Sequence, residues 1–231
     1  MLIDMHSHIL PGMDDGARNL EEAKKTLQIA RRQGFDAMIA TPHLLPDATA
    51  DLRDRVLDAV AQLAPEALRL GIRIYPGMEC FFHSKLPAML ESGRALTLAN
   101  SRYALIAFEE DVSFRELCYG LSAVSECGCV PILAHYERYR CLMNRANLQA
   151  LKQEGVLLQM NYDTVQRVYG IFRYNPFLKH LKNGMVEFMG SDTHGTHFRP
   201  LRTEPSIRWL QNHSLMEAMN RNAERVLNNE Y

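Results

Sequence analysis

The chain has 231 residues, of which 47% are hydrophobic and 23% are charged, as in an ordinary globular protein. This composition excludes a disordered, collagen-like or low-complexity chain. Lys and Arg number 26 and Asp and Glu number 27, so the net charge of −1 argues against nucleic acid or an anionic membrane held by bulk charge.

The cysteines and the first residues indicate a cellular compartment. Five cysteines form no regular disulfide framework in a chain of this length. The start carries Asp4 and two histidines where a signal peptide has a basic head and a long apolar run. No apolar stretch reaches the roughly 18 residues of a membrane span. We therefore expect a cytoplasmic protein with reduced thiols and no membrane insertion.

Short apolar segments bounded by turn residues predict the strands. They are rich in Val, Ile, Leu, Met and Ala, which is typical of strands buried on both faces of a parallel sheet. In chain order they are residues 2–5, 36–41, 72–77, 103–108, 130–134, 156–160 and 186–190.

Helical patterns fill the gaps between these strands. The first begins after Asn19, a predicted N-cap, and ends before Gly34. The predicted helices are residues 20–33, 52–70, 114–127, 145–154, 171–182 and 214–228. This alternation predicts a parallel α/β fold, most simply one barrel, although two half-size domains remain an alternative.

Imidazole and carboxylate side chains follow most of the predicted strands. In an α/β barrel, reacting groups lie at the C-terminal ends of the strands. The candidates at these ends are His6, His8, Asp14, Asp15, His43, Glu79, Glu109, Glu110, His135, Arg138, Asn161, Asp192 and His194. A lone histidine is usually structural, and His83, His180 and His213 are interpreted so, but this joint placement indicates a metal site.

The spacing of the donors supports that interpretation. His6 and His8 share one face of a strand because side chains repeat every two residues, and Asp192 and His194 have the same spacing. Neutral imidazole with carboxylate suits Zn²⁺, Mn²⁺ or Fe²⁺. More than four converging donors indicate a cluster, and metal ions about 3.5–4 Å apart can assist phosphoryl displacement. The Cys-x5-Arg, G-x-S-x-G and phosphate-loop motifs are absent.

Several motifs together resemble a known superfamily. They are MLIDMHSHILPGMDDGA (1–17), ATPH (40–43), PGMEC (76–80), ILAHYER (132–138), GSDTH (190–194) and FRP (198–200). They resemble the polymerase and histidinol phosphatase (PHP) superfamily and, within it, the manganese-dependent, capsule-locus tyrosine phosphatases of the CpsB/YwqE type. The resemblance implies a single distorted (β/α)7 TIM-like barrel over residues 1–231, with parallel strands and the metal site at their C-terminal ends.

The resemblance also implies a ligand set of two or three divalent metal ions, Mn or alternatively Fe or Zn. One ion would be held by His6, His8, Glu79 and Asp192. Glu79 would bridge to a second ion, also held by His135. A third would be held by Asp15, His43 and His194, and Arg138 and Arg199 would hold the phosphate.

Two residues depart from the superfamily's pattern. Tyr136 stands where its His-Pro-Glu-Arg motif has proline. Ala107 stands where it usually has a glutamate ligand, and we expect Glu109 to take that role because residues 107 and 109 face the same way on a continuing strand. Glu110 or a water molecule is the alternative.

The expected function is a metal-dependent phosphomonoesterase in which a metal-bound hydroxide attacks phosphotyrosine in a protein. The resemblance implies a bacterial tyrosine autokinase in exopolysaccharide or capsule regulation as the partner. The balanced charge predicts no nucleic acid partner, and a homo-oligomer is left open. The alternatives are a small-molecule phosphatase of the histidinol-phosphate type and a catalytically weak metal-binding regulatory protein.

Overall fold

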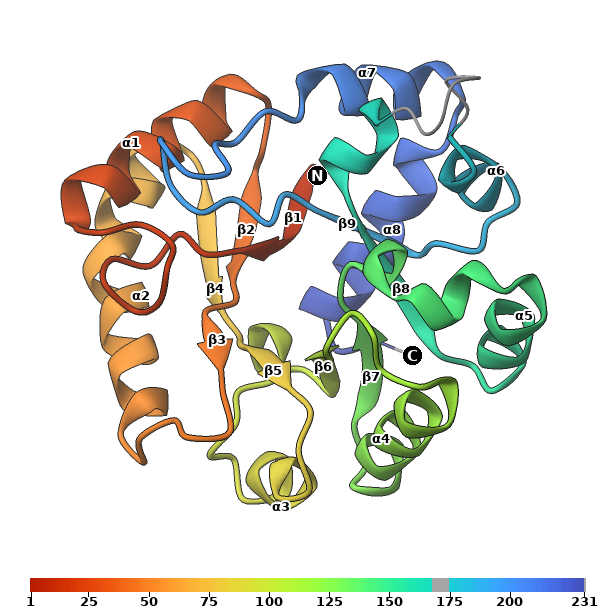
Figure 1. The fold of residues 1–231 in the computed structure, drawn as a ribbon. Helices are drawn as coiled ribbons and strands as arrows, with labels where there is room; N and C mark the ends of the chain where they lie inside the picture. The colour runs from red at the N-terminus through yellow and green to blue at the C-terminus, as the bar shows by residue number, and fades with distance from the viewer. Residues whose placement is uncertain (168–174, 231) are drawn as a thin grey trace.

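The computed structural model describes residues 1–167 and 175–230. Strands and helices alternate along the chain, with the helices outside the strands (Figure 1). Every predicted segment contains a strand. The strands are β1 (Ile3–Ser7), β2 (Ala37–Ala40), β3 (His43–Leu44), β4 (Arg73–Pro76), β5 (Glu79–Phe81), β6 (Tyr103–Ala107), β7 (Val130–Leu133), β8 (Leu157–Asn161) and β9 (Phe188–Gly190).

All ladder pairings are parallel, which confirms the predicted α/β class. One ladder has the order β1-β2-β4 and the other β3-β5-β6-β7-β8-β9. The short strands β3 and β5 follow β2 and β4 after two residues each. The chain therefore passes twice from the first ladder directly into the second. The strands thus form a parallel half-barrel.

The first and last strands also lie side by side. Ser7 forms a parallel bridge with Thr193, beyond the end of β9. The Asp192 amide donates to the carbonyl of His6 over 2.8 Å, and the His8 amide donates to the carbonyl of Thr193 over 2.9 Å. These bonds bring both predicted metal-binding segments to one end of the strands.

Eight helices are found in the described residues: α1 (Leu20–Arg32), α2 (Leu52–Arg69), α3 (Leu86–Glu91), α4 (Phe114–Glu126), α5 (Arg145–Gln153), α6 (Phe177–Lys182), α7 (Glu204–Asn212) and α8 (Met216–Leu227). The Asn19 side chain accepts from the Glu22 amide, which confirms the predicted start of α1. The first residues of the predicted helix 171–182 lie outside the described residues. Helices α3 and α7 were not predicted.

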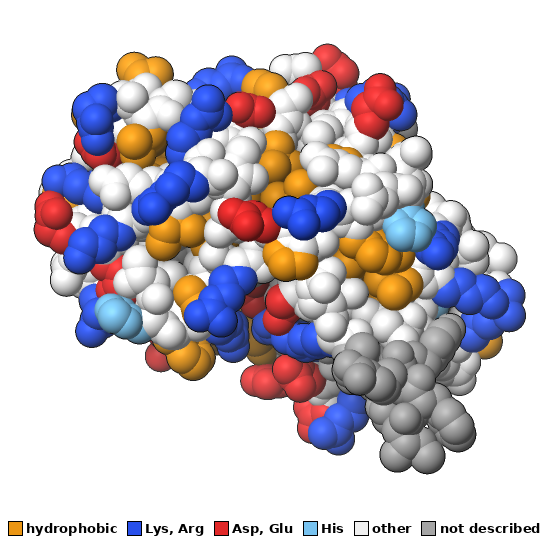
Figure 2. All heavy atoms as spheres, turned by 90° about the horizontal axis from the view of Figure 1, so that it is seen from above, with side chains coloured by type: hydrophobic (Ala, Val, Ile, Leu, Met, Phe, Trp, Pro, Cys, Tyr) orange, Lys and Arg blue, Asp and Glu red, His pale blue; other side chains and the backbone are white. Residues whose placement is uncertain are grey.

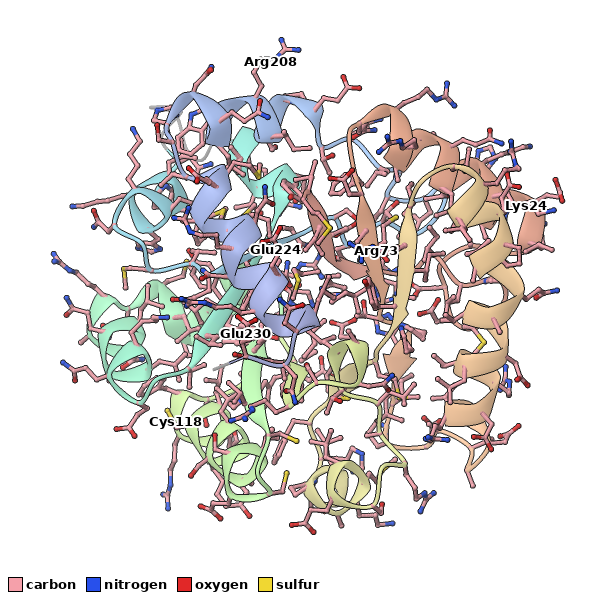
Figure 3. The ribbon with its side chains drawn as sticks, turned by 180° about the vertical axis from the view of Figure 1, so that it is seen from behind. Lys24, Arg73, Cys118, Arg208, Glu224 and Glu230 are labelled. Atoms are coloured by element: carbon pink, nitrogen blue, oxygen red, sulfur yellow. The ribbon has the colours of Figure 1, made fainter. Side chains whose placement is uncertain are left out.

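Side chains alternate between two cores along each strand. On β6, Leu105 belongs to a cluster inside the curved sheet, whereas Ile106 belongs to the larger cluster between the strands and the helices. Ala223 and Val226 of α8 complete the inner cluster at the N-terminal ends of the strands. Figure 3 shows α8, which carries Glu224, crossing the back of the molecule. The donors therefore lie at the open end.

The surface mixes both signs of charge. Figure 2 shows Lys and Arg interspersed with Asp and Glu on one face, and hydrophobic side chains in small groups. Among the residues that the structure describes, no helix combines the length and the apolar character needed to cross a membrane.

Candidate metal centre

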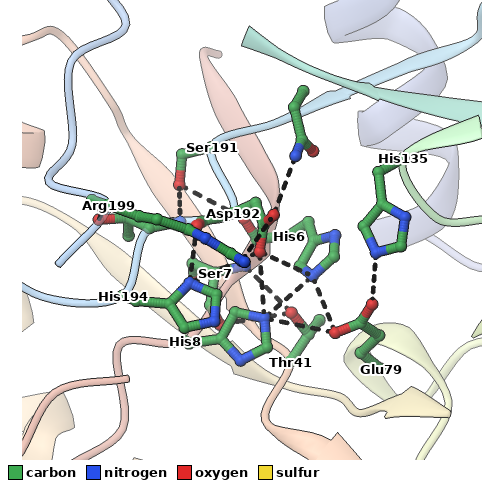
Figure 4. A network of polar contacts seen from close by, with 12 residues as sticks. His6, Ser7, His8, Thr41, Glu79, His135, Ser191, Asp192, His194 and Arg199 are labelled. Carbon is green, nitrogen blue, oxygen red and sulfur yellow. Dashed lines mark hydrogen bonds and ion pairs between the residues drawn. The ribbon is translucent and has the colours of Figure 1, made fainter. Parts of the chain in front are cut away.

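The strand ends bring most of the predicted donors together (Figure 4). Six of them are buried or nearly so: His6, His8, Glu79, His135, Asp192 and His194. His6 lies in β1, His43 begins β3 and Glu79 begins β5, while Asp192 and His194 follow β9. Parallel strands present these side chains at the same end of the sheet, which is why donors distant in sequence meet.

A first group of donors surrounds a common point. His6 Nε2 lies 3.1 Å from His8 Nε2, and each lies 3.4 Å from Glu79 Oε2. Asp192 Oδ1 lies 3.7 and 3.4 Å from the same two nitrogens. Four ligand atoms held tetrahedrally about 2.1 Å from an ion lie roughly 3.4 Å apart. These four residues therefore fit the ligand set expected for one divalent ion.

A second group lies beside the first. One donor atom each from His8, Asp15, His43 and His194 falls within 4.8 Å of all the others. Asp15 Oδ1 is 3.3 Å from Nε2 of both His43 and His194. The buried His194 Nε2 makes no hydrogen bond to any described residue. A buried ring nitrogen without a hydrogen-bond partner fits a metal ligand. This group could therefore hold another ion.

Glu79 belongs to the first group and also contacts His43 of the second group and His135. Its Oε1 is 2.7 Å from His135 Nε2, and its Oε2 is 2.8 Å from His43 Nδ1. Oε2 thus faces histidines of both groups while Oε1 faces His135, so Glu79 could contribute to one ion of these groups and to another held by His135.

Two orienting residues complete the site. Asp14 Oδ2 lies 2.7 Å from His8 Nδ1 and accepts from the His43 amide over 3.0 Å. Gln159 Oε1 lies 3.1 Å from His6 Nδ1 and accepts from the His135 amide over 2.8 Å. A proton on Nδ1 leaves Nε2 free toward a metal. Asp14 was among the candidates at the strand ends but not in the expected ligand set. Gln159 was missed, and its signal was a lone amide in an apolar strand.

Asp192 links the donors to the arginines. While Oδ1 faces His6 and His8, Oδ2 accepts from Asn161 Nδ2 over 2.9 Å. The guanidinium groups of Arg138 and Arg199 pair with the same oxygen, Arg199 at 3.4 Å. The two predicted phosphate-binding arginines thus lie beside the donor cluster, Arg138 at 20% side-chain exposure and Arg199 at 44%.

The backbone at the site is strained. Three of its residues have φ angles in the left-handed region that favours glycine: +32° at His135, +51° at Asp192 and +42° at Arg199. Each such residue costs on the order of 1–3 kcal/mol. The hydrogen bonds just described hold these side chains in place despite that cost.

Burial and charge shift the pKa values of the donors. Burial alone would lower the pKa of His6 and His8, but the carboxylates around them outweigh it and raise both. Burial would raise the pKa of Glu79 and Asp192, yet the neighbouring imidazoles lower both well below the usual range. The pKa of His194 falls to about 4 because it is buried and lies beside His8. The cluster therefore favours cations at its centre.

Metal binding should weaken as the pH falls. A metal ligand must be a neutral imidazole, and the raised pKa of His6 and His8 lets protons compete at a higher pH than for free histidine. We expect Mn²⁺ affinity to fall by about tenfold per pH unit for each proton displaced. Calorimetry between about pH 6 and 8, in buffers of different ionisation enthalpy, would measure both the affinity and the protons released. An affinity independent of pH would contradict this prediction.

Glu109 lies outside both donor groups. Strand β6 ends at Ala107, and the Glu109 carbonyl accepts from the Val112 amide in a turn. The alternation of a continuing strand, on which the expectation depended, therefore stops before this residue. Glu109 is exposed but still lines the cavity over the donors, as does Glu110. Its ligand role stays a prediction.

A cavity of about 560 Å³ opens over the cluster. Glu79, His135 and Asp192 line its floor together with Arg138 and Arg199, and Phe81 and Phe108 add apolar wall. Small-molecule sites commonly have volumes of roughly 300–1,000 Å³. The cavity is thus large enough for an aryl phosphate.

The chain is similar to known proteins over most of its length. The family model described as capsular polysaccharide synthesis, CpsB/CapC, matches residues 2–228. The chain is 30% identical over 207 residues to tyrosine-protein phosphatase CpsB of Streptococcus pneumoniae, covering 86% of this chain and 85% of that protein. It is 28% identical over 238 residues to tyrosine-protein phosphatase YwqE of Bacillus subtilis strain 168, covering 99% and 92%.

A solved structure extends the similarity to the fold. It belongs to the crystal structures of YwqE from Bacillus subtilis and CpsB from Streptococcus pneumoniae, described as unique metal-dependent tyrosine phosphatases. The TM-score is 0.89 at 27% identity, over 100% of this chain and 96% of that chain.

Proposed function

The chain belongs to the CpsB/CapC family of capsular polysaccharide synthesis proteins, and from this membership we propose that it is a metal-dependent tyrosine-protein phosphatase. One observation supports this most directly. Arg138 and Arg199 pair with Oδ2 of Asp192, whose Oδ1 faces His6 and His8. Cations for a phosphate and ligands for metal ions thus share one cavity.

The proposed ligand sets follow the observed donor groups. His6, His8, Glu79 and Asp192 would hold one ion, and Asp15, His43 and His194 another. Glu79 and His135 would contribute to a further ion, for which Glu109 is an additional candidate ligand. Two or three divalent ions fit these donors, and a hard-to-borderline set of imidazole and carboxylate accepts Mn, Fe or Zn.

The reaction needs no nucleophilic side chain. Bound divalent ions would supply Lewis acidity toward a phosphoryl oxygen and an activated water. Arg138 and Arg199 would bind the non-bridging phosphate oxygens through charge-assisted hydrogen bonds, which strengthen as charge develops in the transition state. Asp14 would keep the proton of His8 on Nδ1, and Asn161 would hold Asp192 in orientation.

Finer features of the proposal depend on the same family membership. We propose that residues 1–231 form one domain and that β1 and β9 close the half-barrel into a distorted (β/α)7 barrel, as the bridge between Ser7 and Thr193 supports. The proposed substrate is a phosphotyrosine protein in the cytoplasm, such as a tyrosine autokinase of capsule regulation. Self-association remains open to measurement.

Phosphatase activity should require metal and not a thiol. Cys80 follows Glu79, but its side chain belongs to the core between the strands and the helices. Cys118 lies on α4 at the periphery (Figure 3). Burial raises the pKa of Cys80, Cys118 and Cys141, which leaves little thiolate. We expect a chelator to abolish activity, Mn²⁺ to restore it, and thiol alkylation to spare it.

The assay should compare a phosphotyrosine peptide, histidinol phosphate and an aryl phosphate, with metal content measured alongside. Hydrolysis of histidinol phosphate alone would favour the small-molecule alternative. Loss of activity on alkylation with metal content intact would contradict the proposed mechanism.

A further inference from the structure

A second cavity of about 470 Å³ adjoins the cavity over the metal centre. The two share lining residues, namely Phe81, Phe108 and Glu109. A substrate held in the first cavity therefore has the second directly beside it. Of the proposed ligands, Glu109 lines this second cavity, which we call the side cavity, and the phosphate-binding arginines do not line it.

One wall of the side cavity is aromatic. The rings of Phe82 and Phe108 stack with centroids 5.3 Å apart, and Tyr119 of α4 meets Phe82 edge-on at 6.3 Å. Gly120 of α4 allows this packing, because a Cβ there would lie 2.7 Å from Phe108 and 2.9 Å from Phe82. Tyr119 is 69% exposed although it is a large aromatic residue. The wall thus presents ring surface to solvent.

The rim of the side cavity is acidic. Glu109, Asp111 and Glu116 line it, and no lysine or arginine is among the described residues that do so. Within the described part of the chain, none of the three carboxylates forms a salt bridge. Glu116 caps α4 through Oε2 with Ser113. Its other oxygen and the Asp111 carboxylate stay available to a cation, whereas Glu109 is already a candidate metal ligand.

We propose that the side cavity binds a lysine or arginine side chain of the protein substrate, within about three residues of the phosphotyrosine. An aromatic face and unpaired carboxylates together favour a cation over a neutral or acidic side chain. The two cavities thus have opposite preferences, an anion beside the arginines and a cation beside the acidic rim. This inference rests on the proposed phosphatase function and adds a sequence preference to it.

Synthetic phosphotyrosine peptides would test the preference on the Mn²⁺-loaded full chain. Each peptide carries Lys, Ala, Leu or Glu at one position from −3 to +3, in an otherwise constant sequence. At one or more positions we expect kcat/KM to be about three- to tenfold higher with Lys than with Ala, and lowest with Glu. This difference should shrink in high salt, because the carboxylates are solvent-exposed.

Variants would assign the preference to the side cavity. The ratio of kcat/KM for the Lys and Ala peptides is measured within each variant, so a change in overall activity cancels. Asp111→Lys should remove or invert the ratio, and Tyr119→Leu should reduce it. Asp58→Lys, the same charge change on α2 and outside both cavities, should keep the wild-type ratio.

Different results would contradict the lysine preference and the phosphatase function. Equal kcat/KM for the Lys, Ala and Glu peptides, or highest values with Leu, would overturn the assignment of a cation to this cavity and leave phosphatase function intact. A preference for Lys that survives Asp111→Lys would overturn it as well. Absence of hydrolysis with every phosphotyrosine peptide would instead contradict the proposed function.

Discussion

Replacing Arg138 with alanine should lower kcat/KM for an aryl phosphate by roughly 30- to 1,000-fold while metal content stays near that of the wild type. The guanidinium is mostly buried beside Asp192, on the side of the carboxylate away from the histidines. Loss of one contact that stabilises transition-state charge costs about 2–4 kcal/mol. Arg199 is 44% exposed and 3.4 Å from the same oxygen, so Arg199→Ala should cost less.

Arg208 on α7 offers a matched control. It is exposed at the periphery of the molecule (Figure 3) and does not line the cavity over the donors. A surface arginine of this kind changes stability by only a few tenths of a kcal/mol when substituted. If Arg138→Ala hydrolyses the aryl phosphate as fast as Arg208→Ala, the assignment of Arg138 to the phosphate is wrong. Metal analysis of each variant separates this role from ligation.

Glu79→Gln should have a larger effect. The substitution keeps the shape of the side chain but removes the charge that faces His6, His8 and His43. We expect metal content to fall by at least one ion and turnover to fall on the order of 10³-fold or more. An exposed glutamate of α1, Glu21, gives the control Glu21→Gln. Wild-type metal content in Glu79→Gln would rule out the bridging role.

The free energy of unfolding of the metal-free protein should also depend on the Glu79 carboxylate. The raised pKa of His6 means that its pairing with Glu79 stabilises the fold fully below the unfolded pKa of about 6.5 and less as the pH rises through the folded value. Breaking a buried ion pair costs up to about 3–5 kcal/mol. Denaturation of Glu79→Gln with a chelator present should therefore show a larger deficit near pH 6 than near pH 8.5.

The strands were predictable because strands buried on both faces consist of short, continuous apolar segments. All seven predicted segments contain strands, and most donors follow from where those strands end. The short strands β3 and β5 were not predictable, since two or three residues carry no periodicity. They form strands because β3 pairs with β5 and β5 pairs with β6, which are contacts that the local sequence does not show. Helix α7 begins at Glu204, with Pro205 in its first turn, and was not predicted although it has the same length as the predicted α5.

Side-chain orientation needed tertiary structure. Gln159 and Asp14 act through histidines that precede them or lie far away in the chain, and no spacing rule connects such pairs. The expectation for Glu109 assumed that β6 continues past Ala107. Where a strand ends depends on its partners, because the ladder stops when the neighbouring strand diverges. Residue types thus predicted the chemistry of the site, and the fold determined which atoms meet.

The left-handed backbone at His135, Asp192 and Arg199 has a consequence for directed evolution of this protein. Glycine at any of the three would relax the backbone but delete a donor or a cation. A library screened for heat resistance alone would therefore enrich inactive clones at these codons. Selection must score turnover in every round, and thermostabilising substitutions are better sought on the outer helices, where no such conflict exists.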